Sequence, residues 1–214
     1  MNSDMVACYR QRANEYEKIY ARAERQDDLL LAGKILQNIF ADKDVFEVAC
    51  GTGYWTERIA KTARSVLATD INDAVIEIAG SKNYGSAKVD FQKADIFELS
   101  NSFRCKNLFG GFIWSHVRLE ELNRFISIIN GLAEQGGSIV FIDNNYVEGS
   151  SLPVRDTDEF GNTYQLRTLE NGTMHRIVKN FPTENFLRRS LGDAVMNFDF
   201  KSLQYYWILR YKIL

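Results

Sequence analysis

The sequence predicts one α/β domain, in which helices cover both faces of a mostly parallel sheet. Along residues 45–142, short apolar runs rich in β-forming residues alternate with segments of helical periodicity. The 214 residues are 45% hydrophobic and 25% charged, which is enough to build one core. The sequence contains no internal repeat or Pro-rich linker that would divide it.

The elements follow in order along the chain. From Asp4 to Phe40 the spacing is helical and no Pro interrupts it, so we expect two helices in residues 1–40. The core, residues 41–143, is expected to contain three helices, at 55–61, 73–79 and 119–133. Its expected strands are 45–49, 65–69, 89–94, 108–114 and 138–142.

The last third breaks this alternation. Two β-like runs, 164–169 and 174–178, meet at Glu170-Asn171-Gly172, which predicts a hairpin inserted within residues 144–182. In residues 183–214 we expect a helix from Thr183-Glu184 to about Leu191. Strands at 197–203 and 206–213 would then form an antiparallel pair and bring the sheet to seven strands.

Composition excludes several classes of protein. With 26 basic and 28 acidic side chains, the chain has no excess positive charge for nucleic acid. Its apolar runs are shorter than a membrane span, and its N-terminus lacks a secretory signal, so we expect a soluble cytoplasmic protein. The widely spaced Cys8, Cys50 and Cys105 indicate free thiols, with no disulfide framework and no metal site.

A glycine turn and the carboxylates that end the strands indicate a nucleoside site. Gly51 and Gly53 follow the first core strand, where they allow a tight turn and a close approach to a ligand. Asp70 ends the second strand, nineteen residues after Gly51, where a carboxylate can accept from both ribose hydroxyls. Asp95 ends the third, placed to accept from an adenine amino group.

The same motif separates two nucleoside cofactors. A dinucleotide site favours a glycine where this chain has Thr56. Glu47, four residues before Gly51, would repel a pyrophosphate but suits the ammonium group of a methionine moiety. S-adenosylmethionine is therefore the expected cofactor and S-adenosylhomocysteine the product, with Ile71 and Ile96 packed against the base and no metal required.

Residues 45–143 resemble the class I methyltransferases, whose first motif reads acidic-x-Gly-x-Gly-x-Gly. The resemblance implies a Rossmann-like fold with an N-terminal helical lid. Ala49 replaces the first glycine, which is tolerable while its φ stays negative. The cofactor-binding residues expected from the motif, the strand ends and this resemblance are Tyr16, Glu47, Ala49, Gly51, Gly53, Tyr54, Trp55, Asp70, Ile71, Asp95, Ile96 and Trp114.

Four segments are similar to a small-molecule branch of that family, which includes a phosphonate O-methyltransferase of antibiotic biosynthesis. They are 9–16, 51–56, 167–172 and 177–181. The resemblance implies that the lid residues Tyr9, Arg12 and Tyr16 contact the methionine end of the cofactor, and that Tyr9 and Arg12 also bind the substrate, although plain helix packing explains them equally well. It also implies that Arg167 and Lys179 bind the substrate.

The hairpin's cations suit an anionic group such as a carboxylate or phosphonate. A two-residue turn would place Arg167 opposite Arg176, with Lys179 on the other face. A three-residue loop would place Arg167 and Lys179 on one face, and the sequence leaves both registers open.

His116 follows the fourth strand and is the candidate general base. The expected function is methyl transfer to a small, anionic metabolite, with O-methylation favoured. A non-catalytic S-adenosylmethionine-binding protein and an NAD-dependent reductase are the alternatives. The expected partner is a small molecule, with neither nucleic acid nor membrane, and the expected assembly is a monomer or homodimer.

Overall fold

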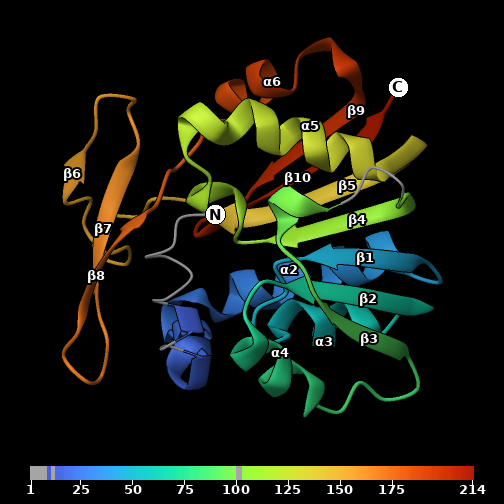
Figure 1. Ribbon diagram of the computed structural model, residues 1–214, viewed down its shortest axis with the longest axis horizontal. Helices are drawn as coiled ribbons and strands as arrows, with labels where there is room; N and C mark the ends of the chain where they lie inside the picture. The colour runs from blue at the N-terminus through green and yellow to red at the C-terminus, as the bar shows by residue number, and fades with distance from the viewer. Residues whose placement is uncertain (1–8, 11–12, 100–102) are drawn as a thin grey trace.

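The computed structural model describes residues 9–10, 13–99 and 103–214, without the side chains of Asn14 and Tyr16. Its main sheet has seven strands in the order β3-β2-β1-β4-β5-β10-β9 (Figure 1). Strands β1 to β5 run parallel, while β10 is antiparallel to both β5 and β9. The strands are β1 Asp44–Val48, β2 Ser65–Asp70, β3 Lys88–Lys93, β4 Cys105–Gly111, β5 Ala133–Asn144, β9 Val195–Ser202 and β10 Tyr206–Ile213. The expected seven-stranded, mostly parallel sheet is confirmed.

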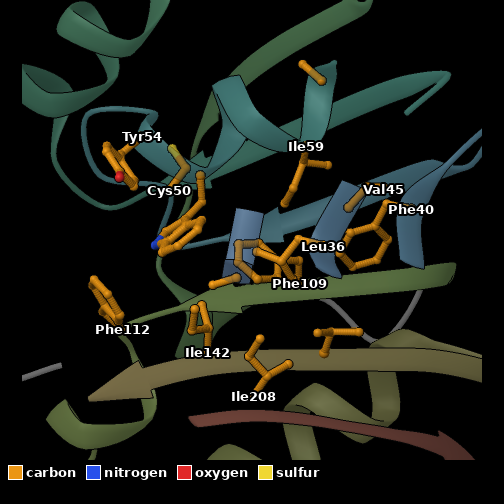
Figure 2. Packing of buried hydrophobic residues seen from close by; sticks show 14 of the residues in the cluster. Leu36, Phe40, Val45, Cys50, Tyr54, Ile59, Phe109, Phe112, Ile142 and Ile208 are labelled. Carbon is orange, nitrogen blue, oxygen red and sulfur yellow. The ribbon is translucent and has the colours of Figure 1, made fainter. Parts of the chain in front are cut away.

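Helices cover both faces of this sheet. Residues of α2 and α3 pack in one hydrophobic cluster with β1, β4 and β10, as Figure 2 shows for Leu36, Phe40, Ile59 and Phe109. Residues of α5 and α6 pack in a second cluster on the opposite face. The α-helices are α2 Gln26–Phe40, α3 Tyr54–Ala60, α4 Asp73–Gly80, α5 Leu122–Leu132 and α6 Glu184–Leu191.

Short 3₁₀ helices connect many of these elements. They are η1 Ala13–Tyr20, η2 Ala23–Arg25, η3 Ile96–Glu98, η4 Trp114–His116, η5 Leu119–Glu121 and η6 Gly192–Ala194. Of the first expected N-terminal helix, residues 9–10 are α-helical and Ala13–Tyr20 form a 3₁₀ helix. No helix in the described part of the chain is long and apolar enough to cross a membrane.

A second, three-stranded sheet stands apart from the main one (Figure 1). It contains β6 (Asp156–Thr157), β7 (Thr163–Thr168) and β8 (Met174–Val178), all antiparallel. In the β7–β8 hairpin, Arg167 pairs with His175, and the Leu169 N–H donates to the Thr173 carbonyl. This is the register with the three-residue loop, so Arg167 and Lys179 share a face.

Two expected boundaries in the core are wrong. Strand β4 ends at Gly111 rather than at Trp114, because Phe112 has a positive φ of 58° and turns the chain into η4. Strand β5 begins at Ala133, five residues earlier than expected, and it pairs with Cys105 of β4 before a register shift. Trp114 consequently lies in η4, not at a strand end.

Candidate active site

A cavity opens at the carboxyl ends of β1, β2 and β4, the edge where α/β sheets bind ligands. We call it the cofactor cavity. Seven of the residues singled out in the sequence line it, from five different stretches of chain. They are Tyr9, Ala49, Gly51, Asp70, Ile71, Ile96 and His116.

Asp70 is anchored at the rim of the cofactor cavity by backbone donors. The Gly51 N–H donates to its Oδ2 at 2.9 Å, and the Asn72 N–H donates to its Oδ1 at 2.9 Å. Burial raises the pKa of Asp70, and these donors together with the Ile71 N–H oppose that shift. The anchored carboxylate thus joins the glycine turn to the end of β2.

Ala49 adopts a left-handed conformation with a φ of 53°, which corrects the expectation of a negative φ. Its backbone lines the cofactor cavity, where the family motif has glycine. A side chain there costs about 1–2 kcal/mol in the left-handed region.

We therefore expect Ala49→Gly to stabilise the protein by about 1 kcal/mol, because glycine adopts this φ without strain. Urea unfolding measures the change. The matched control is Ala68→Gly in β2, which should destabilise the protein, since Ala68 is fully buried in an ordinary strand. If Ala49→Gly destabilises the protein as Ala68→Gly does, the backbone at Ala49 is not strained.

Glu47 does not line the cofactor cavity within the residues described there. Its side chain is 1% exposed, and its Oε2 accepts from the Thr56 hydroxyl at 2.7 Å. Burial raises the pKa of Glu47 to about 8, against the hydrogen bond from Thr56. The carboxyl group is thus held by Thr56 of α3 and not at the cavity lining, and its contact with a methionine ammonium group stays a prediction.

This burial predicts a pH effect on stability. Between the unfolded pKa, about 4.5, and the folded pKa, about 8, the folded chain keeps a proton on Glu47 that the unfolded chain loses. The free energy of unfolding should therefore fall as the pH rises through that window, by about 1.4 kcal/mol per pH unit relative to Glu47→Gln. Urea unfolding of both proteins at about pH 5 and about pH 8 measures it. A constant difference between them would show that Glu47 is not buried in its neutral form.

Other expected cofactor contacts lie outside the cavity lining. Tyr54 stacks on Tyr20 with ring centroids 3.4 Å apart, and Trp55 is buried in the core beside it (Figure 2 labels Tyr54). Trp114 is buried against Phe125 on the opposite face of the sheet. These three positions are therefore packing residues in this structure.

Gly53 and Asp95 shape the backbone near the cavity. Gly53 begins α3 with a φ of 80°, and a Cβ there would lie 2.5 Å from the Tyr84 hydroxyl. Asp95 accepts the Phe97 N–H at 2.9 Å and so caps η3, which carries the cavity residue Ile96. Arg12 and the side chain of Tyr16 lie outside the described residues.

A second cavity of about 300 Å³ adjoins the first. Tyr9, Phe112 and His116 line both cavities and form the wall between them. The second cavity is also lined by Arg167 and Lys179 of the hairpin, on the shared face that the observed register gives them. A cation-lined space thus meets the cofactor cavity at one wall.

Lys179 is almost fully buried and is held by two groups. Its ammonium donates to the Ser115 hydroxyl at 2.6 Å and to Asp143 Oδ1 at 3.1 Å. Asp143, at the end of β5, is 0% exposed and also accepts the Ser115 N–H on Oδ2 at 2.8 Å. Burial lowers the pKa of Lys179, and the charge of Asp143 opposes that shift. Asp143 of the main sheet therefore connects to Lys179 after the hairpin and to Ser115 of η4.

His116 is fixed as a neutral ring. Its Nδ1 lies 2.6 Å from the Val178 carbonyl oxygen, which can only accept, so Nδ1 carries the hydrogen. Nε2 then accepts from the Tyr9 hydroxyl at 2.8 Å. Burial, with the charge of Lys179 second, lowers the pKa of His116 to about 3. At neutral pH the lone pair on Nε2 points toward the Tyr9 hydroxyl, within the wall between the two cavities.

Sequence reasoning missed Asp143 and the arginines Arg22 and Arg25, which line or support the second cavity. Asp143 had a usable signal, since it ends the fifth strand just as Glu47, Asp70 and Asp95 end the first three. The two arginines had none, because their place depends on how the N-terminal segment folds back over the sheet.

Comparisons with known proteins identify the core. Residues 45–137 match the sequence model of a family described as a methyltransferase domain. They include the glycine turn, Asp70 and Asp95, and hence most of the cofactor cavity. No curated protein matches the sequence.

Solved structures extend the likeness in fold to nearly the whole chain. A DhpI–SAH complex is 24% identical with a TM-score of 0.77, covering 98% of this chain and 95% of that one. A DhpI–SAM–HEP complex is 24% identical, with a TM-score of 0.79 and coverage of 98% and 96%. Magnesium protoporphyrin IX methyltransferase from Synechocystis PCC 6803, with bound SAH, is 16% identical, with a TM-score of 0.63 and coverage of 94% of both chains.

The chain therefore has the class I fold of S-adenosylmethionine-dependent methyltransferases, and its residues 45–137 match a methyltransferase domain. S-adenosylmethionine would supply an electrophilic methyl group on a sulfonium. Asp70 and the Gly51 turn could hold its ribose, and Ile71 and Ile96 could offer apolar surface for its base. The described residues contain no cluster of three or more His, Cys, Asp or Glu side chains that could hold a metal ion.

Proposed function

We propose that this protein methylates an oxygen atom of a small, anionic metabolite bound in the second cavity. The observation that carries the proposal is the shared wall of Tyr9, Phe112 and His116, across which a cation-lined cavity meets the cofactor cavity. Methyl transfer is an in-line displacement, so it needs alignment of the two ligands and exclusion of water. Arg167 and Lys179 would orient the anionic group.

The state of His116 favours an acceptor that arrives already deprotonated. With a pKa of about 3, His116 is a weak base at neutral pH, and a carboxylate or phosphonate oxygen needs no base. Its Nε2 can still accept a hydrogen bond from a hydroxyl acceptor in place of Tyr9. Proton acceptance by His116 thus stays a prediction for hydroxyl acceptors, and orientation is its role for anionic ones.

The experiment measures S-adenosylhomocysteine formation with matched acceptors, namely propylphosphonate and butyrate against neutral 1-butanol. We expect turnover with an anionic acceptor and none with 1-butanol. Arg167→Gln should raise KM at least tenfold, because a charge-assisted contact contributes about 1.5–3 kcal/mol. The matched control is Arg104→Gln. Arg104 is a basic residue that lines neither of these two cavities among the described residues, so its replacement should leave KM unchanged.

Binding of S-adenosylmethionine without turnover of any acceptor would favour the non-catalytic alternative. Turnover of 1-butanol alone would contradict an anionic acceptor. With butyrate as the acceptor, whose carboxylate is ionised above about pH 6, kcat/KM is expected to show no transition from there to about pH 8, because the pKa of His116 is low. A cytoplasmic location and a monomeric or homodimeric state stay predictions from the sequence.

A further inference from the structure

The second cavity carries positive charge at two places. Lys179 and Arg167 come from the β7–β8 hairpin, whereas Arg22 and Arg25 come from the N-terminal helical segment. Among the described residues that line this cavity, none is a carboxylate. The proposed function uses only the hairpin cations, which leaves the arginines of the N-terminal segment without a role.

Arg22 and Arg25 converge on Ser150, in the loop after β5. Nη2 of Arg25 donates to the Ser150 carbonyl oxygen at 3.0 Å, and Nη1 of Arg22 donates to the same oxygen. Nε and Nη2 of Arg25 also donate to the Ser150 hydroxyl, at 3.0 and 2.9 Å. Two guanidinium groups thus share one neutral acceptor, although like charges this close repel each other. An anion beside them would relieve that repulsion.

One carboxylate accompanies this arginine pair. Glu24 accepts from the Ser150 hydroxyl at 2.9 Å and lies 3.8 Å from Nη1 of Arg22. Within the described chain, no ion pair joins Arg25 to a carboxylate, and its side chain is 8% exposed. A single exposed glutamate therefore balances one of two guanidinium charges, and the pair keeps a net positive charge.

The two cationic places belong to one electrostatic environment. Burial lowers the pKa of the Lys179 ammonium, and the charges of Arg167 and Arg25 both lower it further, against the opposing charge of Asp143. Arg25 is thus near enough to act on Lys179 through space. Apolar side chains, Phe112, Leu152 and Phe181, complete the lining of the same cavity.

We propose that the methyl acceptor carries two anionic groups on a short carbon chain, and that the cavity binds them at its two cationic places. The inference rests on the proposed function. The group that is methylated binds at Arg167 and Lys179, because Lys179 bonds to Ser115, the neighbour of the wall residue His116. The second group, a carboxylate or phosphate, binds at Arg22 and Arg25, and the chain between them lies against the apolar lining.

The test compares two probes that differ by one charge, 3-phosphonopropionate and propylphosphonate, titrated into the protein saturated with S-adenosylhomocysteine. We expect the wild type to bind 3-phosphonopropionate about tenfold more tightly, because the second charge-assisted contact adds to the first. Arg22→Gln should remove most of this difference. Lys34→Gln, the same charge change at an exposed position of α2, should preserve it.

Equal affinity for the two probes in the wild type would overturn the inference, as would an equal loss of both in Arg22→Gln. Failure of the proposed function gives a different result, because it shows in the separate assay as binding of S-adenosylhomocysteine with no methylation of any anionic acceptor. Methylation of propylphosphonate with no preference for the second charge would overturn this inference alone.

Discussion

Replacing Asp143 with Ala should lower the free energy of unfolding by about 3–5 kcal/mol. The substitution leaves the buried Lys179 ammonium without its counter-charge and the Ser115 N–H without its acceptor. For a chain of this size, each kcal/mol lowers Tm by roughly 2–4 °C. Thermal and urea unfolding measure the loss.

Two controls separate this effect from ordinary loss of a charge. Asp73→Ala breaks the exposed pair with Lys93 and should cost less than about 1 kcal/mol. The double variant Asp143→Ala/Lys179→Met should recover part of the loss, because no uncompensated charge then stays buried. Equal stabilities of Asp143→Ala and Asp73→Ala would show that Asp143 does not hold the hairpin to the sheet.

Replacing Asp70 with Ala should weaken binding of S-adenosylhomocysteine at least a hundredfold. Two hydrogen bonds from ribose hydroxyls to a carboxylate correspond to about 3 kcal/mol or more, and the Gly51 turn also loses its anchor. Calorimetric titration measures the loss. A cooperative unfolding transition in the variant would show that the fold survives.

The matched control is Asp90→Ala, an exposed carboxylate of β3 that does not line the cofactor cavity among the described residues. Its loss breaks the exposed pair with Lys88 and should weaken binding far less than the loss of Asp70. A larger effect at Asp90 than at Asp70 would mean that the ribose lies elsewhere.

The sequence predicted the positions of the strands well where the hydrophobic pattern was strong. The apolar runs at β1, β2 and β10 and the glycine turn at Gly51 were each found, because burial on both faces of the central sheet leaves a continuous apolar run in the sequence. The end of β4 was missed, because the positive φ of Phe112 has no signature in a bulky residue.

The candidate site was predicted in part for a similar reason. A strand end can be read from the sequence, so Asp70, Ile71 and Ile96 were placed at the cavity. The direction of a side chain cannot be read from the sequence. Glu47 was therefore expected at the cavity, whereas its carboxyl group bonds to Thr56 in the core. The arginine pair at Ser150 depends on contacts across more than a hundred residues of chain.

The cofactor cavity is expected to bind S-adenosylmethionine. The most direct test is calorimetric titration of the wild-type protein with S-adenosylmethionine, S-adenosylhomocysteine and NAD under the same conditions. We expect micromolar binding of the first two and none of NAD. Binding of NAD alone, or of none of the three, would contradict it.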